Sequence, residues 1–162
     1  MMSPEELFSL YAELSLGLAG FAGVVSAFAG RDRTFRPTER VRFLAVVIAS
    51  GSVLSGCFTF FAAIAGGLSL STSYRLTGVV CLAFTLVSFV PNFVAAWRAA
   101  KDPDSTTEYW SLYVSAGAYV AICSVYLAAL LTGYGFACLV VGFSIQLLHG
   151  LWMFVRVLTR AN

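Results

Sequence analysis

Two ionisable side chains lie inside otherwise apolar stretches of this sequence and are the first candidates for chemistry. Glu13 lies six residues into the stretch that begins at Leu7, and it shares a helical face with Gly17 and Gly20. A carboxylate in hydrocarbon costs several kcal/mol, so this face should point at another helix or at a cavity. Glu13 either is protonated or reaches the external headgroups, or it attracts cations or binds protons where several subunits converge.

The only histidine, His149, lies in the last apolar stretch, with Gln146 one turn before it. A lone intramembrane histidine serves either as an interhelical hydrogen-bonding group or as a proton relay. At about 1.5 Å per residue, Glu13 lies about 9 Å and His149 about 20 Å from the outer ends of their helices. The two side chains are therefore not expected to meet, and Gln146, at an intermediate depth, is the expected partner of Glu13.

Polar side chains also follow the third apolar stretch at helical spacing: Thr77, Cys81, Thr85, Ser88 and Asn92. Spacings of four, four, three and four place them on one helical face, which either lines a water path or bonds to neighbouring helices. Asn92 is the member most costly to bury without a partner. Pro91 beside it predicts a kink that frees a backbone carbonyl.

Phenylalanines are the candidates for a gate. Phe58, Phe61 and Phe89 either fill the core or face lipid, or they close a pore by excluding water if they converge at an oligomer axis.

Small residues recur every three positions in the first apolar stretch, at Gly17, Gly20 and Gly23. Such residues let helix backbones approach closely inside a membrane. The pattern predicts either tight packing within one protomer or an interface between subunits.

The most polar segment carries five arginines: Arg31, Arg33, Arg36, Arg40 and Arg42. It either fixes the orientation of the chain and contacts anionic headgroups, or it docks a cytosolic partner. Because arginine binds phosphate bidentately, that partner would be acidic, or would handle nucleotides or nucleic acid.

Five apolar stretches must position these residues, and each is long enough as a helix to cross a hydrocarbon core of about 30 Å. With 59% hydrophobic and 11% charged residues, the whole chain, 1–162, is predicted to be one all-α polytopic membrane domain. The acidic start with Ser3 and Glu6 predicts a capping box and a retained first span, not a cleaved signal peptide. The predicted spans are Leu7–Ala29, Val41–Ala65, Tyr74–Ala96, Tyr109–Leu131 and Phe136–Leu158.

Basic residues predict the orientation of these spans. If the spans alternate in direction, nine of the ten Lys and Arg residues share one side, and only Arg75 lies opposite. Because positive charge is retained on the cytoplasmic side, we expect the N-terminus outside and the C-terminus in the cytoplasm.

Patterns for enzymatic or metal chemistry are not found in the sequence. It has no Gly-rich phosphate loop, no Ser/His/Asp arrangement and no histidine pair for haem. The four cysteines fall inside predicted spans without metal-ligand spacing: Cys57, Cys81, Cys123 and Cys138. We expect no enzymatic activity, no cofactor and no metal site.

The first third of the chain resembles small multi-span bacterial membrane proteins of largely uncharacterised function. The resemblance rests on Glu13, the small-residue helix Gly17–Gly23 and the arginine-rich loop that follows. Some proteins of this build resemble channel-forming effectors of anti-phage defence operons, which would imply a bacterial inner membrane. Small multidrug transporters also place a glutamate in their first helix, but that similarity stops at Ala12-Glu13 because they have four spans.

These observations predict a homo-oligomeric, ion-conducting membrane protein that is gated from its basic cytoplasmic face. One five-helix bundle has little room for a pore, so several copies would surround the path. Two alternatives are a proton-coupled small-molecule transporter that uses Glu13 and a non-conducting membrane anchor for a cytosolic partner.

Overall fold

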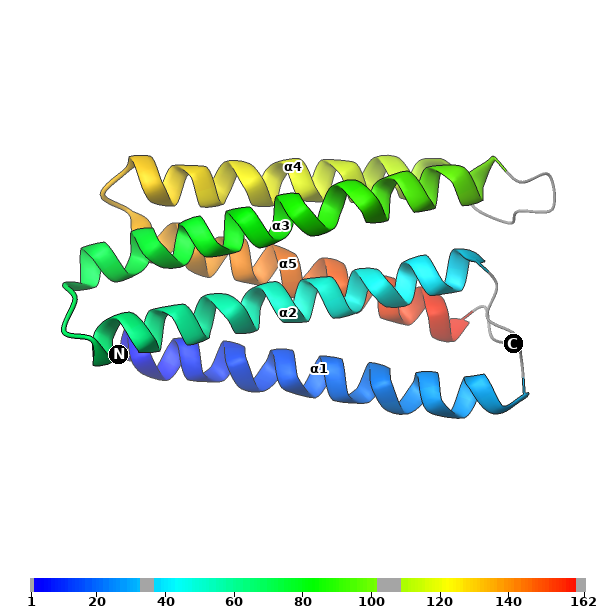
Figure 1. Ribbon diagram of the computed structural model, residues 1–162, viewed down its shortest axis with the longest axis horizontal. Helices are drawn as coiled ribbons and strands as arrows, with labels where there is room; N and C mark the ends of the chain where they lie inside the picture. Colours follow the sequence, from blue (N-terminus) through cyan, green and yellow to red (C-terminus); the bar gives the residue numbers. More distant parts are fainter. Residues whose placement is uncertain (1, 33–36, 102–108, 160–162) are drawn as a thin grey trace.

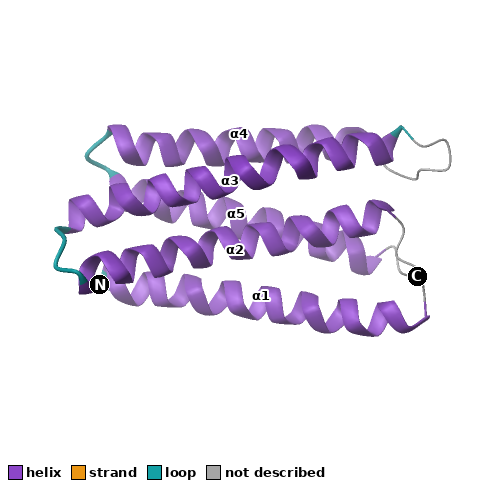
Figure 2. Ribbon diagram, viewed as in Figure 1, coloured by secondary structure: helices purple, strands orange, loops and turns teal. Residues whose placement is uncertain are grey.

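Five long helices lie side by side in the computed structural model, which describes residues 2–32, 37–101 and 109–159 (Figure 1). Helix direction alternates along the chain, so the two termini lie at opposite ends of the bundle, which we call its N-terminal and C-terminal ends. The described residues form helices, turns and loops without a strand (Figure 2). The helices are α1 (Pro4–Asp32), α2 (Pro37–Ala65), α3 (Leu70–Ala100), α4 (Tyr109–Leu131) and α5 (Gly135–Thr159).

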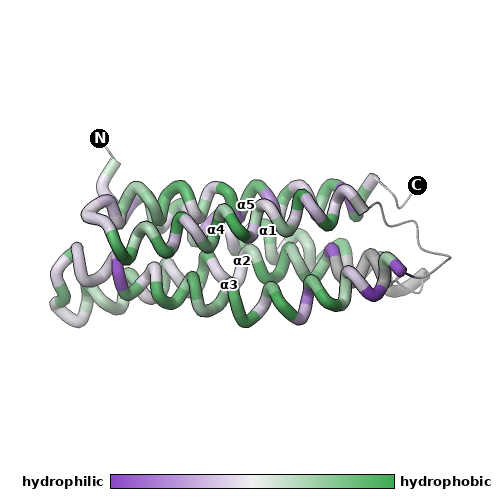
Figure 3. The backbone as a smooth tube through the Cα atoms, turned by 90° about the horizontal axis from the view of Figure 1, so that it is seen from above, coloured by the Kyte–Doolittle hydropathy of each residue, from purple (hydrophilic) through white to green (hydrophobic). Residues whose placement is uncertain are grey.

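All five helices are long and apolar enough to cross a membrane. Figure 3 shows that hydrophobic residues predominate along each of them. The predicted all-α architecture is therefore confirmed, and the predicted spans agree with the helix ends to within four residues. The C-terminal end of the bundle is where α1 and α5 finish and where α2 begins.

Local sequence explains how two of the helices begin. At the start of α1, the Ser3 N–H donates to Glu6 Oε2 at 2.7 Å and the Glu6 N–H donates to Ser3 Oγ at 3.2 Å, which confirms the capping box. Between α2 and α3, Gly67 adopts φ 78°, a left-handed conformation that glycine adopts without steric cost. Ser69 then caps α3 by accepting a hydrogen bond from the Thr72 N–H at 3.3 Å.

Helices α2, α3, α4 and α5 form a four-helix core, and α1 packs on the outside of it against α2 and α5. The interior is aromatic toward the N-terminal end of the bundle. Phe8 of α1 stacks on Phe60 of α2 with ring centroids 4.2 Å apart, and it meets Phe143 of α5 edge to face. The Phe8 side chain thus anchors α1 to the core.

Glycines let α5 approach its neighbours closely. A Cβ atom added to Gly142 would lie 2.4 Å from the Tyr126 ring of α4, and one added to Gly56 of α2 would lie 2.7 Å from the Phe143 ring. Both rings are fully buried and cannot move aside cheaply. The core of the protomer is therefore closely packed in these layers.

We predict that Gly142→Ala destabilises the protein by about 1–3 kcal/mol, because the new methyl group must displace the Tyr126 ring. Gly117→Ala on α4 is the matched control, since nothing lies within 4 Å of a Cβ added there. Thermal unfolding of the purified variants in detergent measures the difference. Equal midpoints for the two variants would contradict the close packing of α4 on α5.

Candidate functional site

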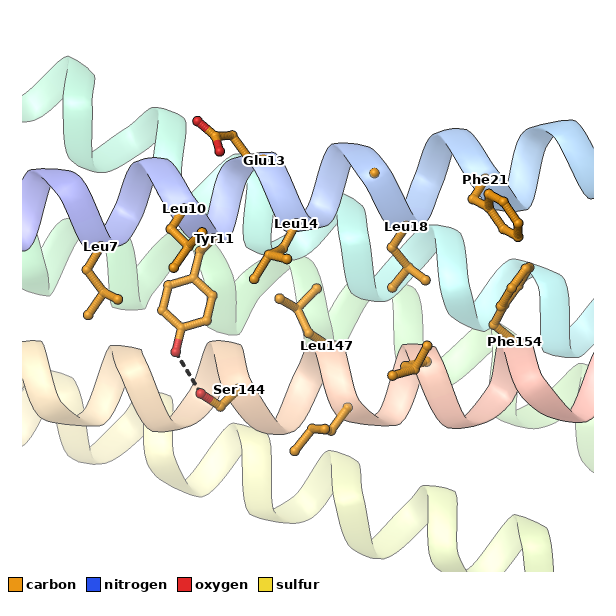
Figure 4. Close-up of a pocket in the computed structure, with 13 residues that line it drawn as sticks. Leu7, Leu10, Tyr11, Glu13, Leu14, Leu18, Phe21, Ser144, Leu147 and Phe154 are labelled. Carbon is orange, nitrogen blue, oxygen red and sulfur yellow. Dashed lines mark hydrogen bonds between the residues drawn. The ribbon is translucent and has the colours of Figure 1, made fainter.

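Glu13 lies on the side of α1 that faces away from the rest of the protomer. The packed face of α1 is marked by three buried residues spaced seven apart, Phe8, Ser15 and Ala22. Glu13 is exposed, and Figure 4 shows its carboxylate directed away from α5. Within one protomer it therefore meets no other helix, and the expectation that Gln146 is its partner is wrong.

The three glycines of α1 share this exposure. Gly17, Gly20 and Gly23 are all exposed, and nothing lies within 4 Å of a Cβ atom added to any of them. Tight packing inside one protomer is therefore excluded as the reason for these glycines. Glu13, Gly17 and Gly20 together define what we call the outer face of α1. An interface between subunits at this face stays a prediction.

A groove of about 900 Å³ separates α1 from α5 beside the outer face. Its lining is almost wholly apolar, with leucines and two phenylalanines, Phe21 and Phe154, along its walls. Tyr11 and Ser144 meet across it, with their hydroxyl oxygens 2.7 Å apart (Figure 4). Glu13 is also among the residues that line the groove. Such a groove can accept acyl chains, apolar ligands or side chains of a neighbouring molecule.

Inside the four-helix core, hydrogen bonds join one polar side chain from each helix. The Tyr126 hydroxyl of α4 donates to Gln146 Oε1 of α5 at 2.5 Å, and Gln146 Nε2 lies 3.5 Å from Thr85 Oγ1 of α3. Thr85 in turn lies 3.4 Å from the hydroxyl of Ser52 on α2. All four side chains are buried, and we call them the central polar layer. Gln146 thus pairs within the core and is only 1% exposed.

The polar stripe of α3 faces this interior. Thr77, Cys81 and Thr85 are fully buried and Asn92 nearly so. Thr85 bonds to α5, whereas the Thr77 hydroxyl donates to the Ser73 carbonyl of its own helix at 2.8 Å. Hydrogen bonding within and between helices is therefore what these threonines do. The helix continues through Pro91 from Leu70 to Ala100, so the proline does not end it.

A second polar cluster lies closer to the C-terminal end. His149 Nε2 of α5 is 3.3 Å from the hydroxyl of Ser115 on α4, and the His149 ring meets the Tyr119 ring edge to face at 5.3 Å. Asn92 of α3 interacts with Tyr119 as well. We call Asn92, Ser115, Tyr119 and His149 the lower polar cluster. The interhelical hydrogen bond expected of His149 is present.

Sequence reasoning missed Tyr119, Tyr126 and Ser115, which are the α4 members of the central polar layer and of the lower polar cluster. A signal was available, because Ser115, Tyr119 and Tyr126 are spaced by four and seven residues and so share one helical face. Tyrosines of membrane helices are enriched at the water interfaces, so a tyrosine by itself does not indicate a core position.

The three phenylalanines predicted as a gate lie at different places on the protomer. Phe58 is 71% exposed on the surface of α2, and Phe61 packs edge to face against Phe60. Phe89 lies on α3 among Phe93 and Tyr119. They do not converge within one protomer, so a gate built from them stays a prediction for an assembly.

The arginine segment is described only in part. Arg33 and Arg36 lie outside the described residues, and Arg31 and Arg40 belong to α1 and α2 at the C-terminal end. Arg42 is buried in α2, at 6% exposure, and the contact of this segment with a partner or with lipid headgroups stays a prediction.

Arg156 lies at the same end of the bundle and stacks on two tryptophans. Its guanidinium carbon is 4.8 Å from the Trp110 ring centroid and 5.2 Å from that of Trp152. The contact with Trp110 joins the end of α5 to α4, whereas Trp152 belongs to α5 itself.

The part of the chain that the structure describes contains no group of three His, Cys, Asp or Glu side chains able to hold a metal ion. The chain matches no protein-family model, no curated protein and no solved structure. The resemblance to channel-forming bacterial effectors therefore stays a prediction.

Proposed function

We propose that the protein is a homo-oligomeric ion channel of a bacterial inner membrane, in which copies meet along the outer face of α1. The observation that carries this proposal is the exposed carboxylate of Glu13 within a membrane-spanning helix. If that carboxylate faces lipid, its burial in hydrocarbon costs free energy. Beside a water-filled path shared by several subunits it is hydrated and attracts cations.

The packing of the protomer interior argues for a path between copies. Tyr126 and Phe143 fill the core against glycines that have no room for a methyl group. The polar side chains of the central layer bond to one another across the bundle. A continuous ion path through this interior would have to break those contacts, whereas a path along α1 would break none of them.

Gating is proposed to act from the C-terminal end. The exposed Arg98 and Lys101 lie at this end of α3, and α1 and α2 bring Arg31 and Arg40 there. With the N-terminus outside, this end would face the cytoplasm. A cytosolic partner that is acidic, or that handles nucleotides or nucleic acid, would bind the arginine segment and move α1 relative to the core.

The groove between α1 and α5 favours a second candidate, a proton-coupled transporter. Its volume of about 900 Å³ and its apolar lining suit a small hydrophobic substrate, and Glu13 is among the residues that line it. The two candidates differ kinetically, because transport saturates with substrate and is driven by a proton gradient, whereas channel conduction needs neither.

Glu13→Gln should lower the cation-over-anion selectivity of ion flux several-fold, because it removes the only carboxylate of the outer face. The measurement is the reversal potential of purified protein in lipid bilayers under a salt gradient, with a lipid-only control. Glu5→Gln is the matched variant, since Glu5 is an exposed carboxylate at the first turn of the same helix. Unchanged selectivity in Glu13→Gln would remove Glu13 from the ion path, and flux coupled to protons would favour the transporter.

Gly20→Leu should dissociate the oligomer, because the leucine occupies the space that a neighbouring helix would need. The protomer should stay folded, because nothing in it lies within 4 Å of a Cβ atom added at Gly20. Gly117→Leu adds the same volume to an equally open position on α4 and should not change the assembly. Native mass spectrometry from detergent reports subunit number for both variants. An oligomer that survives Gly20→Leu but not Gly117→Leu would place the interface on α4 instead.

Orientation can be tested with a membrane-impermeant maleimide on intact cells. Gly133→Cys, in the exposed turn between α4 and α5, should be labelled from outside. Lys101→Cys, at the end of α3, should be labelled only after the membrane is permeabilised. The wild-type protein supplies the background from its four native cysteines. The reverse pattern would put the arginine segment outside and overturn gating from the cytoplasm.

A further inference from the structure

Arg75 is the only basic side chain that the described residues place near the N-terminal end of the bundle. It lies in the second turn of α3 and is exposed. Within residues 2–32, 37–101 and 109–159, no carboxylate forms an ion pair with it. Retention of positive charge on the cytoplasmic side does not explain an arginine at this end. Its guanidinium is available to an anionic ligand.

Arg75 lines a cavity of about 130 Å³ between the start of α3 and the turn that joins α4 to α5. A bound water needs only roughly 10–15 Å³ of such space, so the cavity has room for a larger group. No carboxylate lines it, so its one full charge is positive and it suits an anion. The other lining residues are Ser71, Tyr74, Ala129, Thr132, Gly133 and Gly135.

Hydrogen bonds within the protein already use part of this polar lining. The Thr132 hydroxyl donates to the Ala128 carbonyl at 2.8 Å and accepts from the Tyr134 N–H at 3.3 Å. By contrast, neither the Ser71 hydroxyl nor the Arg75 guanidinium forms a hydrogen bond with another described residue. Arg75 and Ser71 are therefore the side chains that remain to donate hydrogen bonds to a ligand.

Apolar side chains continue the surface from Arg75 toward the middle of the membrane. Arg75, Val79 and Leu86 are spaced by four and seven residues, so they share one face of α3. Val79 and Leu86 are exposed, as are Leu127 and Leu131 on the neighbouring helix α4. A phosphate held at Arg75 would thus have apolar surface below it, on which acyl chains can pack.

From this arrangement we propose that the cavity binds the phosphate of a membrane phospholipid. The Arg75 guanidinium donates two N–H groups to the phosphate oxygens, and the Ser71 hydroxyl donates a third hydrogen bond. The acyl chains lie along the exposed side chains of α3 and α4. A free anion would satisfy the same donors, but it would leave the apolar surface unused. The lipid site is independent of whether the protein conducts ions.

Cross-linking with a photoreactive lipid tests the site. The full-length protein in detergent receives phosphatidylglycerol that carries a diazirine on its headgroup, and mass spectrometry locates the cross-links after illumination. We expect label on the turn 132–135, reduced several-fold in Arg75→Gln and less strongly in Ser71→Ala. Arg98→Gln is the matched control, because it removes an exposed arginine at the other end of α3 and should leave this label unchanged. Equal label on the turn in the wild type and in both cavity variants would overturn the proposal.

Competition identifies the part of the lipid that is recognised. Unlabelled phosphatidylcholine carries the same phosphate and should displace the photoreactive lipid from the turn 132–135. Diacylglycerol with the same chains lacks the phosphate and should not displace it. Equal competition by the two lipids would overturn the role of the phosphate. Displacement by inorganic phosphate at the concentration of phosphatidylcholine, but not by sodium chloride of equal ionic strength, would assign the cavity to a free anion and overturn the lipid as its occupant.

Discussion

The structure depends on one constraint, which is that hydrocarbon offers no hydrogen bonds, so polar groups must find partners within protein. Helices satisfy the backbone along each span. Hydroxyl groups then use what the helix offers, because Ser and Thr side chains donate to carbonyls one turn earlier. Ser15 donates to the Tyr11 carbonyl and Ser115 to the Ser111 carbonyl in this way. Larger polar side chains cannot be satisfied so locally, and they decide how the helices pack.

The same constraint explains why polar residues occur in two distinct settings. Gln146 and Thr85 lie in the core, where neighbouring helices supply complementary groups at hydrogen-bonding distance. Glu13 lies on the outer face of α1, where the protomer supplies nothing of the kind. The first setting stabilises one arrangement of α2 to α5. The exposed position of Glu13 is unfavourable for a lone protomer in lipid, and for this reason we place the function at α1.

Sequence reasoning predicted where the helices begin and end better than it predicted direction around a helix axis. Helix ends follow from apolar length and from local signals such as Ser3 and Glu6, and the predicted ends agree with the structure to within four residues. The direction of the α3 stripe was also accessible, because its polar residues contrast with apolar neighbours. The direction of Glu13 was not accessible, because apolar residues cover both the packed and the lipid-facing sides of α1. Depth arithmetic therefore paired Glu13 with Gln146, although the two side chains point to different surroundings.

Glycine on the outer face of α1 has an energetic consequence of its own. Each glycine in a helix interior costs up to about 1 kcal/mol relative to alanine, and that cost is offset where another backbone comes close. At Gly142 and Gly56 the cost is offset inside the protomer, because the Tyr126 and Phe143 rings pack against these glycines. Gly17 and Gly20 have no such contacts within the protomer, because nothing lies within 4 Å of a Cβ atom added to either of them. A neighbouring helix packed on this face would supply the missing contacts, and it would also place Glu13 at a junction between subunits, where water can reach it.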